Sequence, residues 1–231
     1  MVDSVAAAVV ALQGDDDHAK NQGLHFLWSN SLGGYGGFSA SDLVEIRERG
    51  GIPPLLALLE TTSDAFHVLL RLLRDDAESK VPIREAGGIP MLIELLHVAH
   101  DPSKQWDAAQ LLGTLSFDDT ESKVAIRQAG GIPPLLKLVN RGTGSAPSTA
   151  ARALRTLASD NDDNAVAIAL ARGRVEAFVE LARRGRVSVR GLGVVDNAGA
   201  AAKRKAALVV SALLRDFPVP RDMKAAIASY L

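Results

Sequence analysis

The sequence predicts an all-α fold made of stacked helical repeats. The main observation is a phrase of the form Ile-Arg-Glu/Gln-x-Gly-Gly-Ile-Pro, which recurs beginning at Ile46, Ile83 and Ile126, with a degenerate copy beginning at Ile168. The apolar residue at the seventh position or its equivalent falls at 52, 89, 132 and 175, so the spacings are 37, 43 and 43 residues. A period near 40 residues is typical of solenoids, in which each helical unit stacks on the next.

Composition supports a folded chain and excludes several classes of chemistry. The 231 residues are 47% hydrophobic and 23% charged, and none is cysteine. Folded chains of this length bury about three-quarters of their unfolded surface, so they need no disulfide or metal to supply a core. Thiol catalysis and cysteine-ligated zinc are excluded. The early apolar run, Val5 to Leu12, is too short for a membrane span and lacks a basic leader, so we expect a cytoplasmic or nuclear protein.

Each Gly-Gly pair predicts a corner between two helices. A glycine just past a helix accepts the left-handed conformation of a C-cap, and a proline suits the first turn of the next helix. After each corner apolar residues recur at i, i+1, i+3 and i+4, which predicts a second helix buried on two sides. These residues are Leu55, Leu56, Leu58 and Leu59, then Leu92, Ile93, Leu95 and Leu96, then Leu135, Leu136, Leu138 and Val139.

A third, longer helix follows the second one in each unit. The apolar pattern places third helices at 65–73, 106–115, 149–157 and 203–214. Before the first full unit, 2–12 has the pattern of a second helix and 18–30 that of a third. The sequence therefore predicts units of three helices, with an incomplete unit at the start.

These segments resemble armadillo repeats. The resemblance rests on the Gly-Gly corner after the first helix, the Ile-Pro start of the second, and the Ala-Ala-x-x-Leu-x-x-Leu form of the third; HEAT repeats have two helices and usually no such corner. It implies a right-handed α-α superhelix, the armadillo solenoid, with about four full repeats. We expect a single domain, 1–231, with partial repeats or caps at 1–30 and 220–231 and full repeats at 41–75, 79–116, 121–158 and 163–215.

The resemblance also implies a binding site. Third helices of armadillo proteins line a concave groove that binds extended peptides, and in importin-α each carries a Trp and, four residues later, an Asn. The matching pair of the last unit is Leu208 and Ala212, and the earlier matching pairs are Phe26 and Asn30, His67 and Arg71, Gln110 and Thr114, and Arg152 and Thr156. Only Asn30 keeps the family's residue, so binding of basic import signals is doubtful. With Arg155, the earlier pairs form the predicted peptide-binding groove.

The arginines of this groove suggest the chemistry of the ligand. Guanidinium groups bind carboxylates and phosphates through paired hydrogen bonds. Arg71, Arg152 and Arg155 therefore favour an extended acidic or phosphorylated segment, which resembles the β-catenin branch of the family. We expect a non-enzymatic scaffold or adaptor that binds another protein.

A basic patch in the last third of the chain is a second candidate surface. Residues 1–140 carry 11 basic and 19 acidic side chains, whereas residues 141–231 carry 15 and 8. The densest basic cluster comprises Arg183, Arg184, Arg186, Arg190, Lys203, Arg204 and Lys205. This asymmetry also allows head-to-tail self-association in a structural assembly. Nucleic-acid binding is disfavoured because the isoelectric point is near 6.5 and no nucleic-acid module is present.

The sequence leaves other binding surfaces and functions open and disfavours catalysis. The irregular loops at 31–41 and 184–202 are alternative contact surfaces, and the chain could be the substrate-recognition part of a larger protein such as a U-box ubiquitin ligase. No motif brings together a nucleophile, a base and an orienting group. Gly191-x-Gly193 follows no convincing strand and opens no helix, so it predicts no dinucleotide site. We therefore expect no catalytic residues, no metal and no cofactor.

Overall fold

The computed structural model describes residues 2–31, 38–98 and 101–171, all of whose regular elements are helical. The chain forms two compact units, Met1–Ala153 and Leu154–Leu231. The helices are α1 (Val5–Gln13), α2 (Asp17–Ser31), α3 (Ala40–Glu48), α4 (Ile52–Ala57), α5 (Asp64–Asp75), the 3-10 turn η1 (Ala77–Ser79), α6 (Lys80–Glu85), α7 (Gly88–Val98), α8 (Pro102–Ser116), α9 (Thr120–Gln128), α10 (Ile132–Arg141), α11 (Ala146–Ala158) and α12 (Asp162–Ala171). The predicted all-α fold is confirmed.

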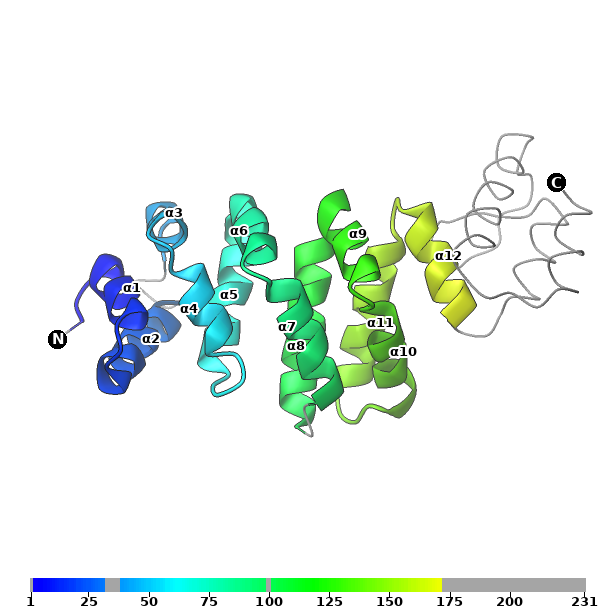
Figure 1. Ribbon diagram of the computed structural model, residues 1–231, viewed down its shortest axis with the longest axis horizontal. Coiled ribbons are helices and arrows are strands. Elements are labelled where there is room, and N and C mark those ends of the chain that lie inside the picture. Colours follow the sequence, from blue (N-terminus) through cyan, green and yellow to red (C-terminus); the bar gives the residue numbers. More distant parts are fainter. Residues whose placement is uncertain (1, 32–37, 99–100, 172–231) are drawn as a thin grey trace, which may run out of the picture. The chain divides into compact units, whose positions relative to one another are not determined.

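The helices of the first unit follow the predicted three-helix order (Figure 1). The partial repeat at the start of the chain consists of α1 and α2. The repeats at 41–75 and 79–116 each supply three helices. The repeat at 121–158 supplies α9, α10 and α11. The boundary between the two compact units follows Ala153 and therefore falls within α11. Of the predicted repeat at 163–215 the structure describes only α12. The prediction of one domain spanning all repeats stays a prediction.

The Gly-Gly corners have the predicted geometry. The first glycine of each pair has a φ of +72°, +76° or +78°, at Gly50, Gly87 and Gly130 respectively. The second glycine is required for space: a Cβ atom on Gly88 would lie 2.8 Å from both Cγ2 and the carbonyl oxygen of Ile83. The same Cβ would lie 3.2 Å from Leu56 of the preceding repeat. The corner therefore fixes the turn between two helices and the approach of neighbouring repeats.

The core runs through the second and third helices. Leu55, Leu92 and Leu135 are at most 1% exposed at equivalent positions of α4, α7 and α10. Most of the apolar residues that define the predicted second helices are buried, whereas Leu58 and Val139 are half-buried. Leu58 follows the end of α4, which has 6 residues where α7 has 11. The 37-residue period is thus accommodated partly by a short second helix.

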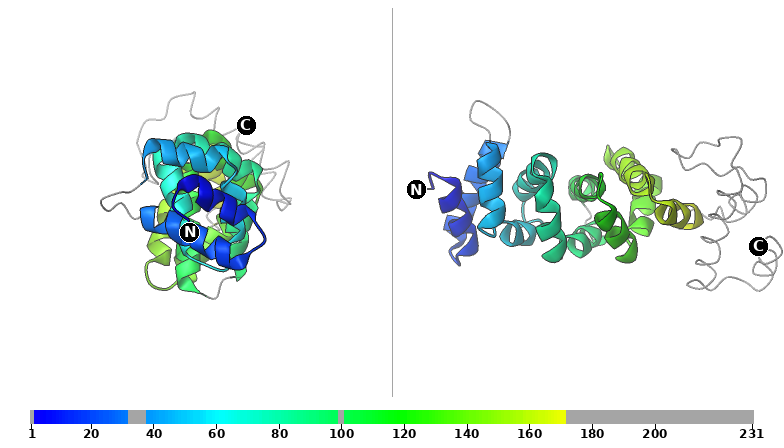
Figure 2. Two further views of the ribbon diagram at one scale, coloured as in Figure 1. Left: turned by 90° about the vertical axis from the view of Figure 1, so that its left-hand side faces the viewer. Right: turned by 90° about the horizontal axis from the view of Figure 1, so that it is seen from above.

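Neighbouring third helices pack side by side in the first unit. α2 packs against α5 and α5 against α8, and Figure 2 shows these helices from two further directions. A Cβ atom on Gly113 of α8 would lie 3.3 Å from Cα of Ala153 on α11, so these two backbones also come close. The third helices of the unit therefore form a row.

Candidate functional site

Seven predicted groove residues lie on this row of third helices. We call the surface that they define the third-helix face: Phe26, Asn30, His67, Arg71, Gln110, Thr114 and Arg152. His67 and Arg152 are exposed, and the other five are half-buried. Arg155 and Thr156 follow in the last turn of α11 but belong to the second unit, where Arg155 is exposed and Thr156 is half-buried.

Two polar side chains of the third-helix face turn back onto their own helices. Asn30 donates from Nδ2 to the carbonyl oxygen of Phe26 over 2.8 Å. The hydroxyl of Thr114 donates to the carbonyl oxygen of Gln110 over 2.9 Å. Both hydrogen bonds connect residues four apart, a common arrangement for short polar side chains within helices. Thr114 has thereby used its one donor, and Asn30 keeps its amide oxygen as an acceptor.

The two arginines of the face donate to oxygen atoms of neighbouring side chains. The Nε atom of Arg71 forms an ion pair with Asp75 one turn later on α5, and about a third of the Arg71 side chain is exposed. Nη2 of Arg152 on α11 lies 3.4 Å from Oε1 of Gln110 on α8. Gln110 and Arg152 therefore join two neighbouring third helices through polar atoms.

A shallow depression of about 410 Å³ adjoins the start of the face. It is lined by Val2 and by residues of α2, namely His18, Asn21, Gln22, His25, Phe26 and Ser29. Phe26 is the member that it shares with the third-helix face. Trp28 and Trp106 are half-buried.

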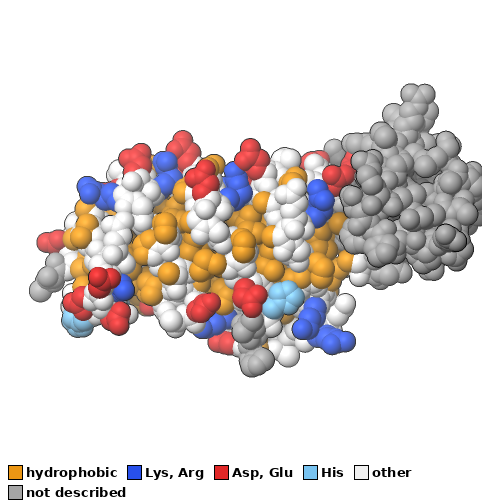
Figure 3. Space-filling view, in the orientation of Figure 1, with side chains coloured by type: hydrophobic (Ala, Val, Ile, Leu, Met, Phe, Trp, Pro, Cys, Tyr) orange, Lys and Arg blue, Asp and Glu red, His pale blue; other side chains and the backbone are white. Residues whose placement is uncertain are grey.

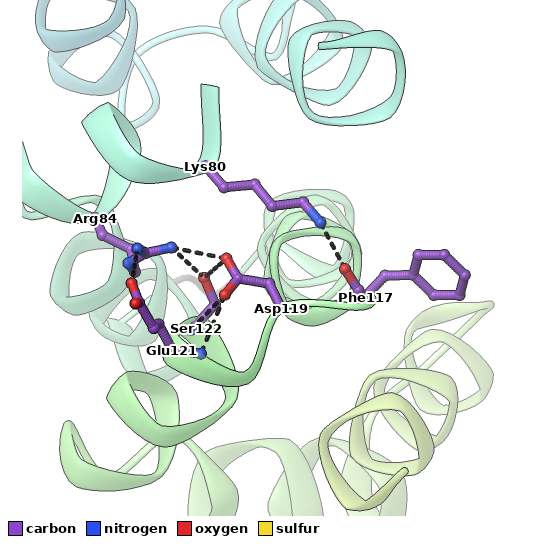
Figure 4. Close-up of polar contacts among 6 residues, drawn as sticks. All are labelled: Lys80, Arg84, Phe117, Asp119, Glu121 and Ser122. Atoms are coloured by element: carbon purple, nitrogen blue, oxygen red, sulfur yellow. Dashed lines mark hydrogen bonds and ion pairs between the residues drawn. The ribbon is translucent and has the colours of Figure 1, made fainter. Parts of the chain in front are cut away.

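The structure reveals a polar cluster between repeats that sequence reasoning missed (Figure 4). Nη1 of Arg84 on α6 lies 2.7 Å from Oδ2 of Asp119 and 3.2 Å from the hydroxyl of Ser122, and Nη2 pairs with Glu121. The ammonium group of Lys80 donates to the carbonyl oxygen of Phe117 at the end of α8. These contacts connect the first helix of one repeat to the start of the next repeat.

Asp119 is the centre of this cluster. Burial alone would raise its pKa, but hydrogen bonds from the hydroxyl and backbone N–H of Ser122, together with the charges of Arg84 and Lys80, outweigh burial, so the pKa lies below its ordinary value. Asp119 also caps α9 by accepting from the backbone N–H groups of Glu121 and Ser122. The carboxylate is therefore held in its charged form.

The same arrangement occurs one repeat earlier. Nε of Arg47 lies 2.8 Å from Oδ2 of Asp76, and Nη2 lies 2.8 Å from Glu78. Asp76 accepts in turn from the hydroxyl of Ser79 over 2.7 Å. A sequence signal existed: in the first two phrases the recurring arginine is followed by an Asp-x-Glu-Ser segment, at 76–79 and 119–122 respectively.

Asp107 on α8 is the clearest buried acid of the described chain. It is 7% exposed. Burial raises its pKa to about 6, and the neighbouring charge of Asp101 contributes further.

Charged and apolar side chains separate on the face of the first unit seen in Figure 3. Apolar side chains form a band there, with charged side chains gathered along both edges. The exposed Val81 and Phe117 show that large apolar groups reach the surface outside the third-helix face, with 45% and 60% of their area exposed. No helix within 2–31, 38–98 and 101–171 is long and apolar enough to cross a membrane.

The predicted basic patch lies outside the described residues. Its members are Arg183, Arg184, Arg186, Arg190, Lys203, Arg204 and Lys205. The irregular loop at 184–202 also lies outside them, as do residues 32–37 of the loop at 31–41.

Comparison with solved structures identifies the fold. An engineered protein from a structural genomics consortium is 25% identical, with a TM-score of 0.64 over 93% of this chain and 85% of its own. A designed armadillo repeat protein in complex with the peptide (KR)4 is 19% identical, with a TM-score of 0.63 over 99% of this chain and 88% of its own. The chain has the armadillo repeat fold.

Further comparisons show how far the likeness to armadillo proteins extends. Computationally designed armadillo repeat proteins for modular peptide recognition match with 18% identity and a TM-score of 0.63, over 98% of this chain and 88% of theirs. At such identities the likeness to designed armadillo proteins concerns the fold alone. No protein-family model and no curated protein matches the chain.

Proposed function

We propose that the chain is a non-enzymatic adaptor that binds an extended segment of another protein along the third-helix face. The observation that carries this proposal is the row of exposed and half-buried polar side chains on successive third helices of an armadillo fold. A designed protein of the same fold was solved with a peptide, (KR)4. Among the described residues no set of catalytic groups competes with this interpretation.

The spacing of the helices suits an extended ligand. Packed helices lie roughly 8–10 Å apart, and an extended chain advances about 3.3 Å per residue. One step between neighbouring third helices then corresponds to about three ligand residues. The row from α2 to α11 would contact a segment of about ten residues, long enough for its side chains to be distinguished.

We further propose that the ligand is acidic. Arg71 and Arg152 present guanidinium groups from α5 and α11, and such groups pair with carboxylates. The designed protein binds a basic peptide, so that comparison gives an acidic ligand no support, and the argument rests on these two arginines. The affinities of the chain for an acidic and a basic peptide test this preference.

The experiment is affinity capture from native cell extract with a matched control. The test variant is Arg71→Glu with Arg152→Glu, and the control is Arg49→Glu with Arg141→Glu, two exposed arginines outside the third helices. We expect partners recovered by the wild type and the control to be lost from the test variant. Equal recovery by all three proteins would contradict binding on this face, and recovery of the chain alone would favour self-assembly.

We also propose a cytoplasmic or nuclear location. The absence of cysteine supports it weakly, because secreted domains often rely on disulfides. Imaging of a fluorescent fusion in the native cell tests the location, and accumulation in a secretory compartment would contradict it.

A further inference from the structure

The polar groups of the third-helix face are not distributed evenly. Near α2, Asn30 has committed one amide hydrogen to a backbone carbonyl and keeps its oxygen as an acceptor. On α8, Thr114 has committed its hydroxyl hydrogen in the same way. Donor groups instead gather where α8 meets α11, at Gln110 and Arg152.

The contact between Gln110 and Arg152 determines what Gln110 presents to a ligand. A guanidinium group carries five N–H donors and no acceptor, so the amide must turn its oxygen toward Arg152. Oε1 of Gln110 does lie 3.4 Å from Nη2 of Arg152. The amide nitrogen of Gln110, with two N–H groups, is left for other partners. Next to a guanidinium this makes a position rich in donors.

We propose that Gln110 and Arg152 together form a carboxylate-binding position on the third-helix face, and that Gln110 makes this face prefer an acidic side chain over its amide analogue. This inference rests on the proposed peptide-binding function and adds the residue that determines specificity. A carboxylate has only acceptors, so it fits a position of donors, whereas an amide brings donors of its own. The occupant is a Glu or Asp side chain of an extended peptide.

Arg71 contributes to the face in a different way. Its Nε already pairs with Asp75 on the same helix, so part of its charge is matched within α5. Arg71 contributes positive charge to the face, while the bridged pair on α8 and α11 provides the position itself.

Binding of defined peptides to the full chain tests the proposal. The probes are fluorescent (GE)4, its amide analogue (GQ)4, and (KR)4, measured by fluorescence anisotropy. We expect (GE)4 to bind about tenfold or more tightly than (GQ)4, the ratio typical of a charge-assisted hydrogen bond. Equal affinity for (GE)4 and (GQ)4, or a preference for (KR)4, would overturn the inference while leaving peptide binding intact.

Two matched variants isolate Gln110. Gln110→Glu keeps the shape and the contact with Arg152 but replaces donors by a negative charge, and Gln128→Glu makes the same change at an exposed residue of α9. We expect Gln110→Glu to weaken (GE)4 binding about tenfold and Gln128→Glu to leave it unchanged. If Gln110→Glu alters the circular dichroism spectrum, Gln110→Met replaces it, because Met removes the donors without adding charge.

The outcomes separate the two proposals. Identical affinities of the wild type and both glutamate variants for (GE)4 would overturn the role of Gln110 and leave the adaptor function standing. Failure of all three peptides to bind the wild type would overturn the peptide-binding function together with the inference.

Discussion

Nη1 of Arg84 lies 2.7 Å from Oδ2 of Asp119, and both side chains are about 15% exposed. Arg84 belongs to the recurring phrase of one repeat, and Asp119 caps the first helix of the next. One carboxylate therefore holds the start of a helix and the arginine of the preceding repeat at the same time. Arg47 and Asp76 form the same kind of pair one repeat earlier.

We predict that Arg84 and Asp119 are energetically coupled. In a double-mutant cycle with Arg84→Met and Asp119→Asn, urea unfolding should give a coupling of about 1–2 kcal/mol, because the pair is partly shielded from water. The surface pair of Glu45 on α3 and Arg49, which follows the end of that helix, is the control and should give about 0.3–0.5 kcal/mol. Coupling no larger than in the control would show that Arg84 does not link the repeats.

The two glycines of a corner should respond differently to alanine. Gly87→Ala meets no atom within 4 Å but forces a left-handed residue, which costs about 1–2 kcal/mol. Gly88→Ala puts Cβ against the carbonyl oxygen of Ile83 and close to Leu56, so it should cost more, about 2–4 kcal/mol. Urea midpoints of the two variants check this order, and a milder effect of Gly88→Ala would contradict the packing argument.

Asp107 should make the protein less stable as the pH rises. Its pKa is about 6 in the folded chain and 3.8 in the reference state, so the folded state binds more protons between these values. The free energy of unfolding should fall between about pH 4 and pH 6 and be flat above, with a contribution of about 1–3 kcal/mol.

Asp107→Asn isolates this term. The variant stays uncharged, so it should exceed the wild type in stability at pH 7.5 and match it below about pH 4. Chemical unfolding at both pH values gives the comparison. A destabilised variant at pH 7.5 would show that the ionised carboxylate makes a favourable contact.

Gly113 should limit the spacing of α8 and α11. A Cβ atom there would lie 3.3 Å from both Cα and Cβ of Ala153, so Gly113→Leu should push the two helices apart and lower stability by about 1–3 kcal/mol. It should also weaken (GE)4 binding, because Gln110 and Arg152 lie on these helices. Unchanged melting temperature and unchanged binding would contradict a close approach at this point.

The recurring phrase made the corners and helix order predictable because they depend on local chemistry. The positive φ values of Gly50 and Gly87, and the helix boundary at Ile52, follow from residues next to one another in the chain. The contact of Arg84 with Asp119 joins residues 35 positions apart, so it depends on how one repeat stacks on the next. A contact between such distant residues becomes apparent only in the three-dimensional structure.

The helices that carry the candidate residues were predictable, but the orientations of their side chains were not. The resemblance placed Asn30 and Thr114 on the third helices, and the structure has them there. That both donate to a carbonyl four residues back, and that Gln110 meets Arg152, depends on rotamers that the sequence pattern does not specify.

Site-specific photo-crosslinking to a captured partner tests the central claim most directly. A photoreactive benzoylphenylalanine replaces either His67, exposed on α5 in the third-helix face, or Glu94, exposed on the second helix α7. Binding along the third helices predicts a crosslink from position 67 that disappears when Arg71→Glu and Arg152→Glu are added, and none from position 94. A crosslink from position 94 alone would contradict the proposal and place the partner on the other side of the repeats.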